Sequence, residues 1–129
     1  MKRIEVMNRA KFVKQGTRMV FLFDLSSLDT DDALQVIHRG EDVIGRMPEK
    51  SVLTLVDISD NHQGNLLKEF TVKLVSKEST FISKVAFSGV SEQSVIKEWS
   101  DLMSSIGNNF KAFKHAVDAV GWLTETGAA

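Results

Sequence analysis

Four short apolar segments recur along the chain, and a helix-length amphipathic segment follows each of them. These four segments read MVFLFDL, VLTLVDI, KVAFSGV and NFKAF. Strands that alternate with helices form a mainly parallel sheet, because parallel strands need a long crossover connection. The sequence therefore predicts an α/β fold in which ligands or partners meet the loops at the carboxyl ends of the strands.

The composition indicates one globular domain that folds without covalent or metal support. The chain has 129 residues, of which 43% are apolar and 26% are charged, the usual balance for globular proteins. A chain of this length buries about two-thirds of its unfolded surface on folding. We expect residues 1–129 to form a single domain, with residues 1–9 and 125–129 loosely ordered.

Several classes of protein are disfavoured by what the sequence lacks. It has no cysteine, which removes disulfides and thiolate metal sites and favours a reducing compartment, so we expect a cytoplasmic protein. No run approaches the ~20 apolar residues of a membrane span. The net charge of −1 provides no field for nucleic acid. Basic residues do gather near the start of the chain, among them Lys2, Arg3, Lys11, Lys14 and Arg18. These indicate a solvated segment and an edge strand guarded by lysines, with a weak anion contact as the alternative.

Turn and cap residues place the individual elements. Residues 10–14 and 18–25 flank Gly16, which can supply the positive φ of a hairpin connection, so these two strands should pair antiparallel. Parallel strands are expected over 51–58, 82–87 and 110–113. We expect four helices, over about 29–47, 65–77, 91–106 and 115–126. Asp29, Asp31 and Asp32 crowd the first turn of the first helix, where capping explains them better than a metal site, and Pro48 should end that helix.

The chain resembles the SpoIIAA-like superfamily, the fold of STAS domains, and in particular its small uncharacterised bacterial members. The resemblance rests on residues 18–28 (RMVFLFDLSSL), 48–60 (PEKSVLTLVDISD) and 84–91 (KVAFSGVS), and on a closing pattern of Phe113, Ala119, Trp122 and Leu123. Together these segments span nearly all of the chain from residue 10 onward. The resemblance implies a mixed, mostly parallel sheet with an N-terminal antiparallel hairpin and surrounding helices.

The resemblance also implies a non-catalytic regulatory role, because STAS domains act as switches that bind protein partners. In anti-sigma-factor antagonists, a serine within Asp-Ser-Ser-Gly after a central strand is phosphorylated. The corresponding loop here runs from Asp57 through Ser59 to Gly64 without that motif, so the acceptor serine cannot be transferred. The superfamily is also linked to lipid-carrying SEC14-like domains, but this chain looks too short for their additional helices.

Short polar groups follow three of the predicted strands and form the candidate binding site. The residues are Asp24, Ser26, Asp57, Ser59, Asp60, His62 and Ser88. Because parallel strand ends meet at one edge of a sheet, we expect these groups to bind a protein partner or a small anionic ligand. The alternative for Asp57 and Ser59 is structural, with their side chains bonding backbone amides to turn the chain. We expect no cofactor, metal or catalytic residue. A homodimer is an alternative partner if Phe12 or Phe81 is exposed.

Two other functions stay open. Response-regulator receivers place an aspartate, an acceptor aspartate, a hydroxyl and a lysine after successive strands, and Asp24, Asp57, Ser88 and Lys114 follow that order. The acidic doublet, the Lys-Pro step and one strand–helix unit are missing, however, and a carboxylate pair is needed to hold Mg²⁺. The other alternative is a small hydrolase using Ser59 and His62, for which no nucleophile elbow or oxyanion donor is evident. Lys114 and His115 form a basic pair at a predicted helix start, where positive charge is unfavourable, and no role is assigned to them.

Overall fold

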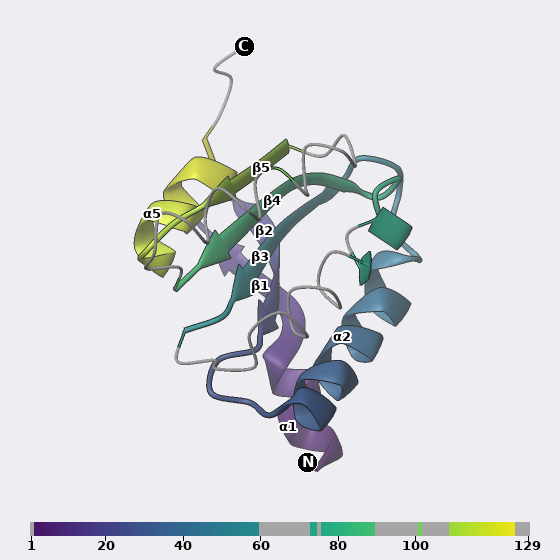
Figure 1. The fold of residues 1–129 in the computed structure, drawn as a ribbon. Coiled ribbons are helices and arrows are strands. Elements are labelled where there is room, and N and C mark those ends of the chain that lie inside the picture. Colours follow the sequence, from purple (N-terminus) through teal and green to yellow (C-terminus); the bar gives the residue numbers. More distant parts are fainter. Residues whose placement is uncertain (1, 60–72, 75, 90–100, 102–108, 126–129) are drawn as a thin grey trace.

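Five strands form one mixed sheet, in the order β1-β2-β3-β4-β5. The computed structural model describes residues 2–59, 73–74, 76–89, 101 and 109–125. The strands are β1 (Ala10–Gln15), β2 (Arg18–Asp24), β3 (Val52–Asp57), β4 (Ile82–Ser88) and β5 (Asn109–Ala112); the helices are α1 (Arg3–Arg9), α2 (Thr30–Ile44) and α5 (Ala116–Leu123). The β1–β2 pair is antiparallel and the other neighbours are parallel. The predicted α/β class and the N-terminal hairpin are therefore confirmed (Figure 1).

A two-residue turn connects β1 to β2. Gln15 pairs with Arg18, which leaves Gly16 and Thr17 as the loop. Gly16 has φ +63°, the positive value that a two-residue hairpin of type II′ requires at its first loop position and that glycine adopts without steric cost. The turn fixes the register of the hairpin, in which Ala10 lies opposite Phe23.

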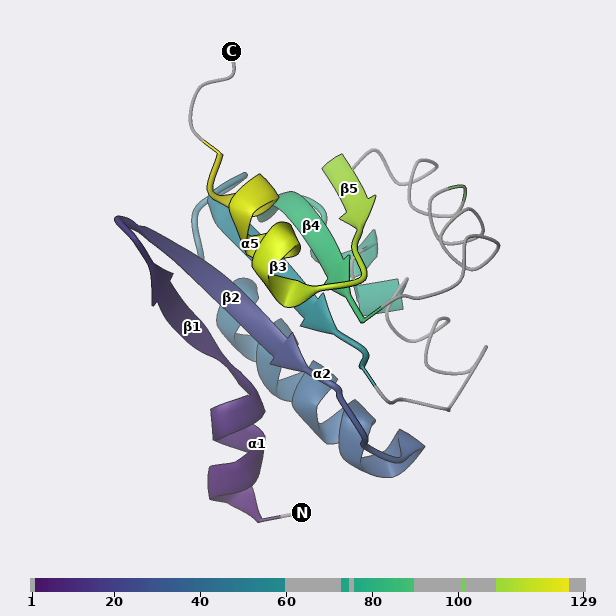
Figure 2. The same cartoon turned by 90° about the vertical axis from the view of Figure 1, so that its left-hand side faces the viewer.

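Helices cover both faces of the sheet. On one face α2 contributes Val36, Ile37 and Ile44 to a core that includes Phe21 and Phe23 of β2. On the other face α5 contributes Ala119 and Leu123 to a smaller cluster with Val20, Leu55 and Ala86. Figure 2 shows α5 in front of β3 and β4, with α2 behind the sheet. Because successive strand residues point to opposite faces, strands buried on both sides have few alternating polar positions, as in β3, where Val52–Val56 are all buried.

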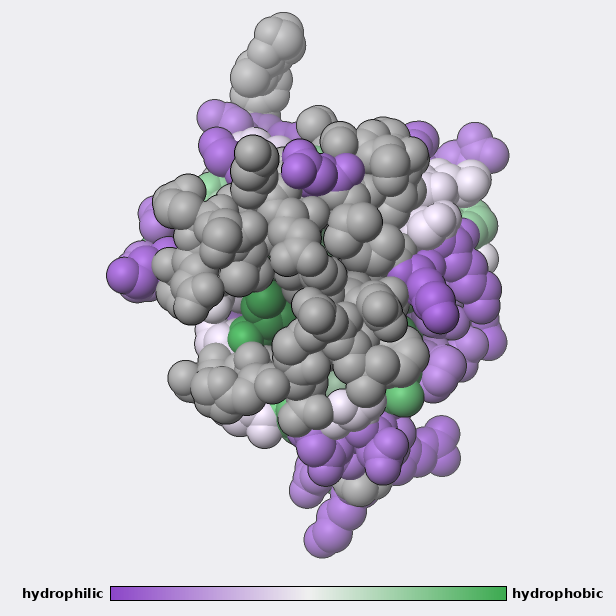
Figure 3. Space-filling view, in the orientation of Figure 1, coloured by the Kyte–Doolittle hydropathy of each residue, from purple (hydrophilic) through white to green (hydrophobic). Residues whose placement is uncertain are grey.

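The start and the buried face of α2 follow the sequence prediction. The Asp29 carboxylate accepts a hydrogen bond of 2.8 Å from the Asp32 backbone amide, which satisfies one of the donors left free at a helix start. The outward side of α2 is hydrophilic in Figure 3. The helix ends at Ile44 with Gly45 as its C-cap, and Pro48 follows three residues after the cap, within the range where proline typically follows a helix end.

One helix differs from the prediction. Residues Arg3–Arg9 form α1 although the sequence indicated a loose lead-in there; this helix lies against α2 and against the first two strands. In α5, Ala119 is buried and Ala116 is exposed. The helices expected over 65–77 and 91–106 fall largely outside the described residues, although Lys73, Leu74, Ser76 and Lys77 have helical backbone. Within the described part of the chain, no helix is both long and apolar enough to cross a membrane.

A glycine lets α2 approach β2 closely. A Cβ at Gly40 would overlap the ring of Phe23, which is fully buried and makes an edge-to-face contact of 5.0 Å with Phe21. The ring has no exposed side into which it could move. Gly121 in α5 is different, because a Cβ there would have no atom within 4 Å.

We predict opposite effects of the same substitution at these two helix positions. Gly40→Ala should destabilise the fold by about 2 kcal/mol, because an overlap this close with a buried ring lies at the upper end of the roughly 1–3 kcal/mol that overpacking costs, and better helix propensity returns about 1 kcal/mol. Gly121→Ala should stabilise it by up to about 1 kcal/mol, since only the propensity changes. Urea unfolding measures both. Equal stability of Gly40→Ala and the unsubstituted protein would contradict the proposed contact.

One buried carboxyl lies behind the end of α2. Glu78 is only 5% exposed. Burial raises its pKa above the ordinary value of 4.5; the nearby Glu41 carboxylate also raises this pKa, while the Lys77 ammonium lowers it. Lys77 is bonded to Glu41 at 3.2 Å. The folded protein therefore holds the Glu78 proton more tightly than the unfolded chain does.

This shift predicts a loss of stability as pH rises. The contribution of Glu78 is fully present below pH 4.5 and is lost as pH rises through the raised pKa of the folded state. Glu78→Gln should flatten the dependence of unfolding free energy on pH above 4.5. Lys77→Met should steepen it, because the charge that lowers this pKa is removed. Urea titrations at a series of pH values test both, and an unchanged slope in Glu78→Gln would contradict the prediction.

Candidate interaction site at the strand ends

The register of the parallel strands brings three predicted site residues into one row. Asp24 pairs with Asp57, and Asp57 pairs with Ser88, across β2, β3 and β4. The preceding residues Phe23, Val56 and Phe87 all belong to the core on the α2 side. Because side chains alternate along a strand, the three row residues are directed to the α5 side. They lie at one end of the sheet, as predicted.

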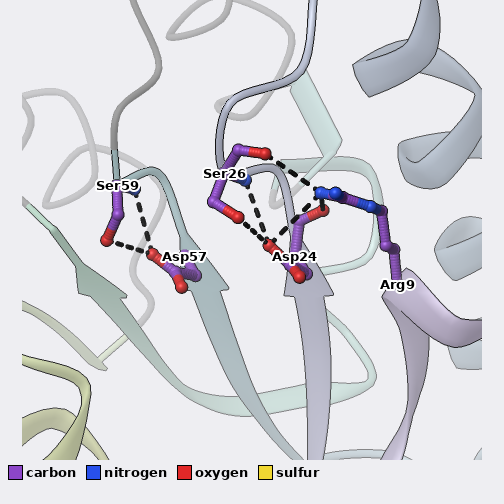
Figure 4. Close-up of polar contacts among 5 residues, drawn as sticks. All are labelled: Arg9, Asp24, Ser26, Asp57 and Ser59. Atoms are coloured by element: carbon purple, nitrogen blue, oxygen red, sulfur yellow. Dashed lines mark hydrogen bonds and ion pairs between the residues drawn. The ribbon is translucent and has the colours of Figure 1, made fainter.

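The two aspartates turn the chain in the same way. The Asp24 carboxylate accepts hydrogen bonds from the Ser26 backbone amide (3.1 Å) and hydroxyl (2.5 Å). The Asp57 carboxylate accepts the equivalent bonds from Ser59, at 3.0 and 2.6 Å. Figure 4 shows the two pairs at the tips of neighbouring strands. This is the structural role that the sequence left open for Asp57 and Ser59, and it occurs at both strands.

Backbone bonds hold the two turns against each other. The Leu25 amide donates to the Asp57 carbonyl at 2.9 Å, and the Ser27 amide donates to the Ser59 carbonyl at 3.1 Å. The ladder between β2 and β3 thus continues beyond the strands. Asp24, Ser26, Asp57 and Ser59 are each partly exposed. We call these four residues the acidic rim; it is a fixed surface with two carboxylates side by side.

Arg9 is a member of this site that the sequence prediction missed. One guanidinium nitrogen of Arg9 donates to the backbone carbonyls of Ser26 (3.0 Å) and Asp24 (3.3 Å) and lies 3.5 Å from the Asp24 carboxylate. In Figure 4 Arg9 approaches Asp24 from the side away from Asp57. The signal was the hairpin register: Ala10 pairs with Phe23, so the residue before β1 lies next to the residue that ends β2.

The charges of the rim are therefore unequal. The Asp24 carboxylate is paired with Arg9, whereas Asp57 has no ion pair within the described residues. The Asp57 carboxylate keeps one oxygen outside the bonds to Ser59. The rim presents its negative charge mainly at Asp57.

Ser88 is in the row but not on the surface. Its side chain is 1% exposed, and its hydroxyl has no hydrogen-bond partner among the described residues. The next residue, Gly89, has φ +84°, and a Cβ there would lie 2.6 Å from the Ser59 amide nitrogen. Glycine at position 89 is therefore needed for the contact between two loops. Ser88 does not contribute to the exposed rim.

The other predicted residues are placed as follows. Asp60 and His62 lie outside the described residues. His115 is exposed at the start of α5 and its side chain makes no capping bond, while the Lys114 carbonyl accepts a bond from the Gly89 amide at 3.2 Å. No group of three metal-ligating side chains occurs in the described part of the chain. The Ser59 hydroxyl donates to Asp57, an arrangement that orders the turn.

We predict that Arg9 stabilises the rim. Arg9→Met should lower the free energy of unfolding by about 1–2 kcal/mol, because three interactions with partly buried oxygens are lost. Arg9→Lys should recover part of this loss, since an ammonium cannot reproduce the planar guanidinium geometry. Arg3→Met, on the exposed side of the same helix, is the control and should change stability by less than about 0.5 kcal/mol. Equal effects at Arg3 and Arg9 would contradict the role of Arg9.

Comparison with solved structures identifies the fold. The chain is similar to the crystal structure of an uncharacterised protein of the DUF3478 family from Shewanella loihica PV-4, described as having a SpoIIAA-like fold. The TM-score is 0.61 and the sequence identity 20%, over 88% of this chain and 91% of that one. No profile of a known protein family and no curated protein sequence matches the chain. The chain has a SpoIIAA-like fold, as the sequence resemblance implied; at this identity the likeness concerns architecture alone.

Proposed function

We propose that this protein is a non-catalytic regulatory domain that binds a protein partner at the acidic rim. The observation that carries the proposal is the pairing of Asp24 with Asp57 in the β2–β3 register, with each carboxylate held by its own serine. Because these bonds already hold both carboxylates in place, the two turns need not rearrange when a partner binds, and this lowers the entropic cost of association. The SpoIIAA-like fold supports the proposal because STAS domains of this fold act as switches. A cytoplasmic location stays our expectation.

A protein partner is favoured over a small anion, the other ligand left open by the sequence. Two neighbouring carboxylates repel an anion, and the Arg9 guanidinium that could attract one is already bonded to Asp24 and Ser26. The Asp57 carboxylate, partly exposed and with one oxygen outside its bonds to Ser59, suits a partner that brings a lysine, an arginine or backbone amides. Complementary charge at such a surface mainly increases specificity and the association rate.

The proposal predicts that charge at the rim controls partner binding. Asp57→Asn and Asp24→Asn keep a side-chain oxygen that can accept the bonds from Ser59 and Ser26, so they remove charge with little change to the turns. Each should weaken capture of a partner from native lysate, and Asp57→Asn should have the larger effect because Asp57 has no ion pair in the described structure. Affinities of the reconstituted complex by calorimetry should fall about tenfold for Asp57→Asn.

Glu49→Gln provides the matched control. Glu49 is exposed and precedes β3, at the end of the sheet opposite to the rim, so the same change of carboxylate to amide should leave capture unaltered. A partner bound equally by all three variants would overturn the rim as its site. Hydrolase activity abolished by both Ser59→Ala and His62→Ala would instead establish the enzymatic alternative.

A receiver-like phosphorylation remains the second candidate, because Asp24, Asp57 and Ser88 do form a row on adjacent strands. Against it, Ser88 is buried and the acidic doublet that would hold Mg²⁺ is missing from the sequence. Incubation with acetyl phosphate and Mg²⁺, followed by intact-mass measurement, distinguishes the two proposals. A phosphoryl adduct lost in Asp57→Asn would support the receiver; an unchanged mass is expected.

A further inference from the structure

The outer edge of the sheet is formed by β1, which pairs only with β2 in the described structure. In a hairpin with a two-residue loop, the pair that flanks the loop exchanges backbone hydrogen bonds, and every second pair does the same. Gln15, Val13 and Lys11 therefore face β2. The backbone amides and carbonyls of Phe12 and Lys14 face away from it, and none of these groups has a partner among the described residues. The Ala10 amide, which also faces outward, is bonded to Val6 in α1.

The side chains along this edge form a pattern of charge and apolar surface. The strand reads Lys11-Phe12-Val13-Lys14 at its centre. Both lysines are exposed, while Phe12 and Val13 are partly buried against the cores on opposite faces of the sheet. Phe12 packs edge-to-face on Phe21 at 5.0 Å and keeps its outer part accessible.

The edge is also uniformly positive. Residues 10–23 include Lys11, Lys14 and Arg18 and no acidic residue. Figure 2 shows β1 at the margin of the sheet, with α1 continuing beyond its first residue. Met19, which pairs with Lys14 on the α2 side, is 50% exposed and adds apolar surface beside that lysine.

We propose that the free edge of β1 binds an extended acidic segment of a partner protein by strand addition. The segment has the pattern acid-apolar-apolar-acid. In a paired strand, the residue across from Lys11 lies on the α5 side and the residue across from Lys14 on the α2 side, three positions apart. The two apolar residues between them lie against Phe12 and Val13 and increase the burial of both. The pattern reads the same in both directions, so it fits parallel or antiparallel pairing.

Lysines on an edge strand ordinarily prevent uncontrolled pairing. Here the lysines make pairing selective. An apolar strand without acids would pair beside two uncompensated ammonium groups, which is unfavourable, whereas acids at the matching positions would form ion pairs with them. A second copy of the chain would bring its own lysines to the edge, and these would not neutralise Lys11 and Lys14. The inference concerns an edge separate from the acidic rim and does not depend on the proposed function.

The test uses an end-capped synthetic peptide, Ser-Thr-Glu-Val-Val-Glu-Thr-Ser, titrated into ¹⁵N-labelled protein and followed by NMR. The amide signals of Phe12 and Lys14 should shift and their hydrogen exchange should slow. A peptide with the core order Val-Glu-Glu-Val, and one with both valine amides methylated, should bind at least about tenfold more weakly. The Val-Glu-Glu-Val peptide moves the acids away from the two lysines. Methylation of both valine amides removes a main-chain donor, because one of the two valine amides faces β1 whichever way the peptide pairs.

Charge exchange on the protein completes the test. The double variant Lys11→Glu/Lys14→Glu should lose affinity for the peptide about tenfold or more, since opposite-charge cross-strand pairs become like-charge pairs. It should gain affinity for the peptide with Lys-Val-Val-Lys at its core. Lys111→Glu is the matched control, because Lys111 is exposed on the opposite edge strand; it should change affinity less than twofold.

Three results would overturn the inference. These are no binding of the peptide, shifts centred on Asp57 and Ser59 instead of Phe12 and Lys14, and affinity insensitive to the charge exchange. Concentration-dependent dimerisation in sedimentation experiments, with shifts of the Phe12 and Lys14 amides on dilution, would assign the edge to a second copy instead.

Discussion

The parallel ladder between β2 and β3 is the constraint on which the rest of the structure depends. Every residue of Val52–Val56 is buried, so the backbone groups of β3 are shielded from water and must be satisfied within the sheet. A shift of one residue would exchange the two faces of the strand and direct its apolar side chains away from α2 or α5. The register that pairs Asp24 with Asp57 is therefore set by core packing, and the acidic rim follows from it.

Opposite charges are separated along the first two strands. The rim ends β2 and β3 with carboxylates, whereas the hairpin before it carries only cationic charged residues between 10 and 23. Arg9 stands at the boundary, where its guanidinium ties α1 to the carbonyls of Asp24 and Ser26. In our two proposals these surfaces attract different chemistry: cationic or amide-donating groups at the rim and acidic strands at β1.

The success of the sequence prediction varied with how local each feature was. The hairpin at Gly16 and the cap at Asp29 depend on backbone preferences within a few residues, and both were found where expected. The strand ends were placed within one or two residues for the same reason. Helix α1 was missed because none of its residues is buried; its sequence has no strong apolar stripe, and contacts with α2 stabilise it. Ser88 was expected at the surface, but its side chain is buried, and its backbone carbonyl accepts a bond from the Ile58 amide of the neighbouring loop.

The sequence by itself determined the five strands, the hairpin followed by parallel strands, and the polar turns after β2 and β3, because periodicity, caps and turn residues act over short distances. Tertiary structure decided which groups meet. Arg9 reaches Asp24, Gly40 admits the ring of Phe23 and Ser88 becomes buried through contacts between segments distant in the chain. Such contacts depend on strand register and on interatomic distances set by the packing of whole segments. A pattern of residue types along the chain does not specify these distances.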